Sequence, residues 1–199
     1  MFKILTIVTL LITMSSFTKA ELIVLASPID NGDGYYTDME DDIFNFHVQY
    51  AKIISKHDDV IILTDSTRYH DYVAELGADK VAIAPMQDIW MRDFTLSNTT
   101  NPIMFRYTAA AQGVGQKGQD DADYVQEAFA KIIDDAELVF KESDLLNDGG
   151  NFVDDYTGNV VVSTKFLADN NFSEDEARKL LTQIPGIKNI AFIEADEQG

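Results

Sequence analysis

The sequence predicts an α/β fold with mixed sheets, and three observations support this prediction. Short apolar runs of strand length alternate along the chain with amphipathic segments of helix length. Loops rich in Gly, Asp and Asn separate these segments. The chain has 199 residues, of which 46% are hydrophobic, and this is enough apolar material for a core of ordinary size.

The first part of the chain is predicted to contain three strands and two helices. The strands are apolar runs at residues 22–26, 60–63 and 81–84. Apolar residues recur at helical spacing from Ile43 to Ile54 and predict the first helix. Acidic residues that favour a helix N-terminus precede it: Asp38, Glu40, Asp41 and Asp42. Ser66 is predicted to cap the second, shorter helix, and Gly77 to end it.

The middle of the chain is predicted to contain a strand, a glycine-rich loop, a helix and another strand. The strands are residues 103–107 and 138–140. Three glycines mark the loop: Gly113, Gly115 and Gly118. An apolar face predicts the helix: Val125, Ala128, Phe129, Ile132 and Ile133. Three acidic residues are placed at its start: Asp120, Asp121 and Asp123.

The last part of the chain is predicted to form a hairpin, a helix and a final strand. Segments 151–153 and 159–163 flank Tyr156-Thr157-Gly158, which is typical of a hairpin turn. Ser173 and Glu176 fit a capping box that opens a helix. The apolar face of that helix contains Ala177, Leu180, Leu181 and Ile184, and residues 190–193 form the last strand. No linker or low-complexity stretch divides residues 21–199, so these are predicted to form one domain.

Residues 1–20 are predicted to be a signal peptide. Lys3 gives a positive start, an apolar run extends from Ile4 to Met14, and Ala20 is a small residue at the expected cleavage point. The run is shorter than the roughly 20 residues that a membrane-spanning helix needs. The alternative is a buried first strand. We therefore expect a secreted or periplasmic protein with no membrane attachment after cleavage.

Composition restricts the partners and the chemistry. The chain has 34 acidic and 15 basic residues, a formal net charge of -19. Because nucleic-acid binding depends on Lys and Arg, we expect no nucleic-acid partner and favour a cationic small molecule or a basic peptide. The absence of Cys excludes disulfides and a cysteine nucleophile supplied by these residues. Loop 30–34 lacks the alternating pattern of a calcium loop, so no calcium site is expected there.

Two polar segments each follow a predicted strand, where binding pockets are common. The first is Asp88-Ile89-Trp90-Met91-Arg92-Asp93, with the only Trp of the sequence, and the second is Asn147-Asp148-Gly149-Gly150-Asn151. Each has a structural alternative. A Trp beside charged residues is often a core ring with its N–H satisfied, and Asp-Gly-Gly is often only a turn.

Considered together, the two segments predict a site for a planar cation. A guanidinium group keeps its charge at physiological pH, and its paired N–H donors match carboxylates in a bidentate manner. Asp93 and Asp148 are the predicted carboxylates, one for each edge of the cation, and Trp90 offers a face for stacking. Gly149 and Gly150 would allow the backbone to approach closely.

The two segments also resemble a known family. Asp-x-Trp-x-Arg-Asp, followed about 55 residues later by Asp-Gly-Gly-Asn, then by Asn170-Asn171 and the segment from Ser173 to Leu181, resembles the agmatine deiminase and bacterial peptidyl-arginine deiminase family. The resemblance covers roughly residues 22–195 and corresponds to the N-terminal half of the family. The order and spacing of the two motifs carry it, because neither motif is specific alone.

The resemblance implies a fold and a chemistry. The family adopts the pentein fold, a propeller of five αβ units, so residues 21–199 are expected to form part of such a propeller. Its members hydrolyse a guanidinium C–N bond and release ammonia without a metal or cofactor. A cysteine thiolate attacks the guanidinium carbon, a histidine in a Gly-His-x-Asp motif transfers protons, and two acidic side chains hold the guanidinium.

By motif position, Asp93 matches the first acidic residue and is the expected catalytic and substrate-binding carboxylate. Asp148 stands where the family commonly has Glu, and Trp90 matches the Trp of the substrate pocket. The sequence departs from the family in Phe94-Thr95, where a Gly-Pro type turn is usual, and it lacks both Gly-His-x-Asp and the late cysteine. The three histidines are interpreted as structural or solvated rather than as a general base: His47, His57 and His70.

We therefore expect a secreted guanidinium deiminase homologue, a hydrolase of linear amidine C–N bonds, that is incomplete in this chain. Its expected substrate is agmatine, which would link it to putrescine biosynthesis, or a peptide arginine. One alternative is a non-catalytic pseudoenzyme or cation-binding module, and another is an acidic α/β domain without a small-molecule site. Half of a closed propeller leaves sheet edges and apolar faces uncovered, so self-association is also expected.

Overall fold

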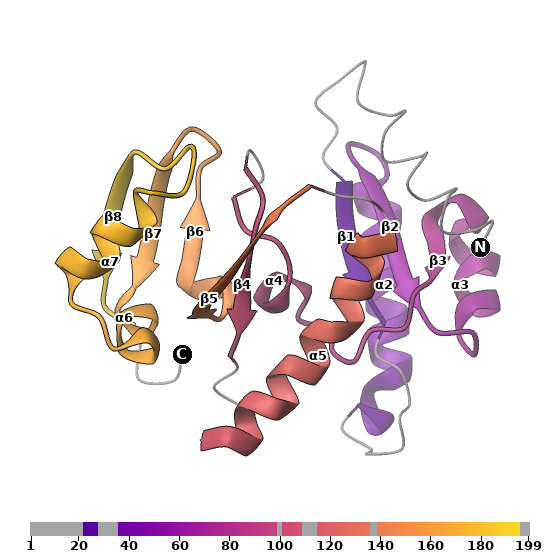
Figure 1. Ribbon diagram of the computed structural model, residues 1–199. Coiled ribbons are helices and arrows are strands. Elements are labelled where there is room, and N and C mark those ends of the chain that lie inside the picture. Colours follow the sequence, from indigo (N-terminus) through magenta and orange to yellow (C-terminus); the bar gives the residue numbers. More distant parts are fainter. Residues whose placement is uncertain (1–21, 28–35, 99–100, 109–114, 136–138, 196–199) are drawn as a thin grey trace. The chain divides into compact units, whose positions relative to one another are not determined.

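The computed structural model describes residues 22–27, 36–98, 101–108, 115–135 and 139–195 (Figure 1). They belong to two compact units. Unit 1 contains residues 1–91 and 128–137, and unit 2 contains residues 92–127 and 138–199. The predicted signal peptide and loop 30–34 lie outside the described residues.

Unit 1 contains a parallel sheet of three strands in the order β1-β2-β3 (Figure 1). The strands are β1 (Leu22–Ala26), β2 (Asp59–Thr64) and β3 (Val81–Ile83). Its helices are α2 (Glu40–Ile54) and α3 (Tyr69–Leu76), with the short helices η1 (Thr37–Met39) and η2 (Ala78–Lys80). The buried core brings together apolar side chains from both helices and two strands: Val48, Ala51, Val60, Ile62, Tyr72 and Val81. The predicted strand and helix order of this part is confirmed.

The ends of α3 show one correct and one wrong prediction. Gly77 ends the helix with a positive φ of 90°, as predicted. Ser66 does not cap it. The N-cap position is Arg68, and no side chain caps the helix there. Asp65 stabilises the preceding turn, because its Oδ1 accepts hydrogen bonds from the backbone N–H of Thr67 at 2.9 Å and of Arg68 at 3.1 Å.

Unit 2 contains a parallel pair, β4 (Ile103–Tyr107) with β5 (Lys141–Asn147), and a mixed sheet of three strands. In the mixed sheet, β6 (Phe152–Asp154) and β7 (Asn159–Ser163) are antiparallel, whereas β7 and β8 (Asn189–Ile193) are parallel. Helices α6 (Thr164–Asn170) and α7 (Glu174–Leu181) complete this unit with α4 (Met91–Phe94) and η4 (Gly149–Asn151). The main core is aromatic and aliphatic and includes Phe105, Phe152, Phe166, Val162 and Leu181.

The predicted hairpin and capping box are both confirmed in unit 2. Segments β6 and β7 form the hairpin, and Gly158 in its turn has a φ of 109°. The Ser173 side chain accepts the N–H of Glu176, and the Glu176 carboxylate accepts the N–H of Ser173 in return. Both features depend on residues close in sequence.

Predictions for the middle of the chain are partly wrong. The strand predicted at residues 138–140 is absent at its described residues, Val139 and Phe140, and the strand is β5 instead. Helix α5 (Gly115–Asp135) begins before the predicted acidic start, so Gly115 and Gly118 lie in the helix rather than in a loop. Gly118 is buried, which explains why a residue without a side chain fits there. Gly113 lies outside the described residues.

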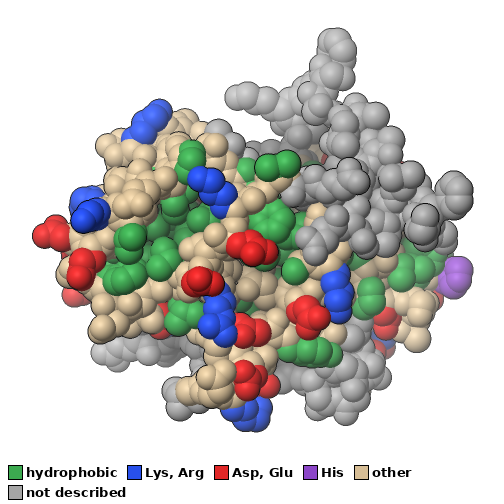
Figure 2. Space-filling model, viewed as in Figure 1, with side chains coloured by type: hydrophobic (Ala, Val, Ile, Leu, Met, Phe, Trp, Pro, Cys, Tyr) green, Lys and Arg blue, Asp and Glu red, His purple; other side chains and the backbone are tan. Residues whose placement is uncertain are grey.

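The α/β class is confirmed, and the mixed sheet is that of β6 to β8. The propeller arrangement stays a prediction. On the face shown in Figure 2, acidic and basic side chains are intermixed, with hydrophobic side chains between them. Within the described ranges, no helix combines the length and the apolar character needed to cross a membrane.

Candidate functional site

The first predicted motif forms a capped turn followed by the short helix α4. Oδ1 of Asp88 accepts hydrogen bonds from the backbone N–H of Ile89 at 2.6 Å and of Trp90 at 3.3 Å, and from the Tyr36 hydroxyl at 2.5 Å. Trp90 is 60% exposed, so the alternative of a buried core ring is wrong. Trp90 belongs to unit 1 and Asp93 to unit 2. Asp88 therefore fixes the backbone of the turn before Asp93.

The second predicted motif is also a turn, at the end of β5. Asp148 is the N-cap of η4, and its Oδ1 accepts the N–H of Gly150 at 3.3 Å. The carbonyl of Asp148 accepts the N–H of Asn151 at 2.7 Å. The turn interpretation is therefore correct, and the same turn fixes the position of the Asp148 carboxylate.

The two motifs meet through their backbones in unit 2. A Cβ placed on Gly149 would lie 1.9 Å from the carbonyl oxygen of Arg92 and 2.9 Å from Cα of Asp93. No side chain fits in that space, which explains the glycine. The Asp93 side chain is close enough to Asp148 to act on the pKa of its carboxyl. Two aspartates separated by 55 positions in the chain thus lie together, as the cation-site prediction requires.

The surroundings of Asp148 change its acidity. Burial raises the pKa of the Asp148 carboxyl above its usual range, and the hydrogen bond from the Gly150 N–H opposes this rise. The positive charge of Lys165 also lowers this pKa, whereas the negative charge of Asp169 raises it. Asp148 is therefore harder to ionise than an exposed aspartate.

Lys165 and Asp169 are neighbours of the site that sequence reasoning missed. They lie one turn apart on α6, and Nζ of Lys165 is 2.6 Å from Oδ2 of Asp169. Both side chains are mostly buried, with exposures of 14% and 23%. The spacing of four residues is visible in the sequence and was the available signal. Their proximity to Asp148 depends on the fold, so nothing in the sequence indicated it.

The histidines and this carboxyl pair belong to different units. His47, His57 and His70 all belong to unit 1. His47 is buried, and its Nδ1 lies 3.0 Å from the Tyr72 hydroxyl. Burial lowers the pKa of His47 from 6.5 to about 4. Among the described residues, no group of three or more His, Cys, Asp or Glu side chains is placed to bind a metal ion.

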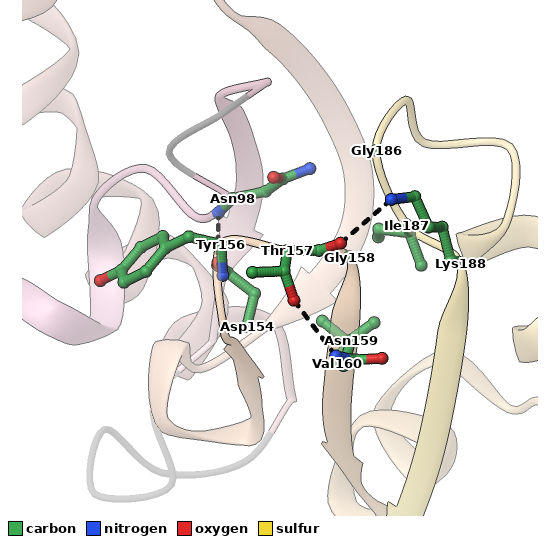
Figure 3. Close-up of a pocket in the computed structure, with 10 residues that line it drawn as sticks. All are labelled: Asn98, Asp154, Tyr156, Thr157, Gly158, Asn159, Val160, Gly186, Ile187 and Lys188. Carbon is green, nitrogen blue, oxygen red and sulfur yellow. Dashed lines mark hydrogen bonds between the residues drawn. The ribbon is translucent and has the colours of Figure 1, made fainter.

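A separate cavity of about 140 Å³ lies beside the β6–β7 turn (Figure 3). On one side of it, Nζ of Lys188 donates a hydrogen bond to the carbonyl of Thr157 at 3.2 Å. Trp90, Asp93 and Asp148 do not line this cavity. The predicted site is therefore a carboxyl pair beside a turn, and it is distinct from this cavity.

Comparisons with known proteins agree with the predicted family. The family model for Porphyromonas-type peptidyl-arginine deiminase matches residues 14–199. Comparison with curated proteins gives no match. The solved agmatine deiminase of C. jejuni has a TM-score of 0.68 at 17% identity, over 89% of this chain and 54% of that chain. Its substrate-bound variant has a TM-score of 0.67 at 16% identity, with the same coverage.

A second enzyme gives a similar result. The agmatine deiminase of Enterococcus faecalis has a TM-score of 0.63 at 17% identity, over 88% of this chain and 50% of that chain. At these identities the likeness concerns the fold, and the chain spans about half the length of the solved structures that it matches. The family model covers nearly all of the sequence, including both aspartate motifs. The chain therefore belongs to the Porphyromonas-type peptidyl-arginine deiminase family.

Proposed function

We propose that this chain contributes the carboxylate side of a guanidinium-binding site in a deiminase. Asp93 and Asp148, both in unit 2, hold the two edges of the guanidinium. The stacking role of Trp90 is proposed from the sequence motif alone. The observation that carries this proposal is the contact of Gly149 with the Arg92–Asp93 backbone, which joins the two aspartates. Family membership supports the same assignment.

The chemistry of the pair suits a cation better than a neutral ligand. Burial raises the pKa of Asp148, so this carboxyl is harder to ionise without a nearby positive charge. A guanidinium offers N–H donors to both carboxylates and neutralises their repulsion, so both groups can ionise. Orientation by two fixed carboxylates would hold the guanidinium carbon about 3 to 3.5 Å from an attacking group.

Agmatine and a peptide arginine are the two substrates that this site could accept. Both carry the same guanidinium, so the carboxyl pair does not distinguish them. The substrate-bound solved structure to which this chain is similar is an agmatine deiminase, which supports the smaller ligand. Agmatine as substrate would place the whole protein in putrescine biosynthesis.

Hydrolysis needs a nucleophile that these residues do not supply. The sequence contains no Cys, so a thiolate would come from outside the 199 residues. The same observation favours the second candidate function, a cation-binding module without catalysis. An ammonia-release assay on this chain with agmatine is expected to give no turnover, and turnover would refute this division of roles.

Binding itself is tested by calorimetry with agmatine and with an arginine peptide. Asp93→Asn and Asp148→Asn are each expected to weaken binding by roughly tenfold to hundredfold, because a charge-assisted contact contributes about 1.5 to 3 kcal/mol. Asp144→Asn is the matched control, since Asp144 is an exposed aspartate on β5. Equal affinities in all four proteins would contradict the proposal.

Fluorescence tests the role of Trp90 separately. It is the only Trp of the chain, so intrinsic emission at long excitation wavelength reports on it alone. Stacking of a guanidinium on the exposed ring is expected to change its emission and to reduce its quenching by acrylamide. Agmatine binding without any change in emission would remove Trp90 from the site and leave the aspartate pair.

We also propose that the protein is exported. Residues 1–20 have a positive start, an apolar run and a small residue at the expected cleavage point. N-terminal sequencing of the protein from its native host is expected to begin at Glu21. A mature protein that retains residues 1–20 would refute export by this signal.

A further inference from the structure

Helix α2 is apolar on the face that points away from its own core. Val48 and Ala51 are buried against the sheet of unit 1, as expected for one face. On the other side, Phe46 and Ile53 are each 59% exposed and Tyr50 is 39% exposed. The Phe46 and Tyr50 rings stack with their centroids 5.4 Å apart. A surface helix with two apolar faces indicates a second packing partner.

Charged residues mark the two ends of this exposed face. At 3.6 residues per turn, Asp42, Phe46, Gln49, Ile53 and Lys56 follow one another along a single stripe. Lys56 lies just past the end of α2, where its N–H still donates to the carbonyl of Ile53 at 3.3 Å. Asp42 and Lys56 are exposed. Within the described part of the chain, neither side chain has an ion-pair or hydrogen-bond partner.

The order of these side chains is self-complementary. The stripe is acidic at its first turn, apolar in the middle and basic at its end. When a second copy lies antiparallel to it, Asp42 faces the partner's Lys56 and Phe46 faces the partner's Ile53. Both pairs are centred on the same point, near Gln49 and Tyr50, as a two-fold axis requires.

We propose that α2 is a homodimer surface, with two copies packed antiparallel through the stripe of Asp42, Phe46, Gln49, Ile53 and Lys56. This inference does not depend on the proposed function. A second copy suits the stripe better than a basic partner, because a basic partner would meet Asp42 favourably but would be repelled by Lys56. The net charge of -19 opposes general association of two copies, so a local, complementary contact is needed.

The size of the face limits the strength of the dimer. A stable interface buries roughly 800 Å² per partner, and one helix face of 15 residues provides less than that. We therefore expect a dissociation constant in the micromolar range or weaker, with rapid exchange between monomer and dimer. Sedimentation equilibrium over a series of concentrations measures this constant directly.

Charge exchange tests the antiparallel arrangement. At a fixed salt concentration of about 0.15 M, Asp42→Lys and Lys56→Asp are each expected to weaken dimerisation by about threefold to tenfold. The double variant is expected to restore it, because opposite charges face each other again. Asp42→Lys makes the chain less negative, so weaker association of this variant cannot come from net charge. A double variant weaker than both single variants would overturn the proposal.

Apolar variants test the middle of the stripe. Phe46→Ala combined with Ile53→Ala is expected to abolish measurable dimerisation. Val153→Ala, which shortens a side chain of unit 2 that is 44% exposed, is the matched control and should leave the constant unchanged. Circular dichroism confirms that each variant is folded. A chain that stays monomeric at every concentration would overturn the proposal.

Discussion

Replacing Gly149 with alanine is expected to disturb the candidate site at its centre. The added Cβ would lie 1.9 Å from the carbonyl oxygen of Arg92, whereas ordinary contact begins at 3.4 Å, so the two backbones must separate by about 1.5 Å. Overpacking of this kind costs about 1 to 3 kcal/mol of the free energy of unfolding. Asp93 and Asp148 then move apart, and agmatine binding is expected to weaken by roughly tenfold or more.

Gly150→Ala is the matched control for this prediction. A Cβ on Gly150 would meet only Oδ1 of Asp148, at 3.8 Å, which is an ordinary contact. Thermal and urea denaturation followed by circular dichroism give the stability of both variants, and calorimetry gives their affinity for agmatine. For a chain of this length, 1 kcal/mol corresponds to about 2 to 4 °C in melting temperature. Equal stability and affinity in the two variants would refute the reasoning from close approach.

Three further predictions concern pH and helix capping. Because burial raises the pKa of Asp148, agmatine affinity should fall on acidification from a higher pH than an ordinary aspartate would give, as measured by calorimetry across pH. The pKa of His47 is lowered from 6.5 to about 4, so stability present above pH 6.5 is lost as pH falls toward 4. That loss is about 3 kcal/mol of the free energy of unfolding. Urea denaturation at both pH values should show no such loss in the His47→Gln variant. Ser173→Ala removes an N-cap and should lower the free energy of unfolding by about 1 kcal/mol, whereas an unchanged value would contradict the capping role.

Features that depend on neighbouring residues were predictable from the sequence. The hairpin around Gly158 and the capping box of Ser173 with Glu176 both form as expected, because their hydrogen bonds span few residues. The apolar strands were also predictable, since burial demands runs such as residues 60–63. Local signals of this kind give the element order of unit 1 and, in unit 2, the hairpin and the capped helix α7.

Features that depend on distant residues were not predictable. Strand β5 includes Lys141, Glu142 and Asp144, all exposed, and shows no apolar alternation. It becomes a strand because it pairs with β4, which no local pattern reveals. The meeting of Asp93 with Asp148 has the same origin, since it depends on backbone contact at Gly149.

The raised pKa of Asp148 has a consequence for how a cation binds. Because burial raises the pKa of Asp148, a cation that binds its ionised form displaces the proton from those molecules in which Asp148 is protonated, and the protein releases it to the medium. The heat of association then contains the ionisation enthalpy of whichever buffer accepts the proton. Calorimetric titrations with agmatine in phosphate and in Tris should give different heats of binding but the same affinity. The difference between the two heats gives the number of protons released.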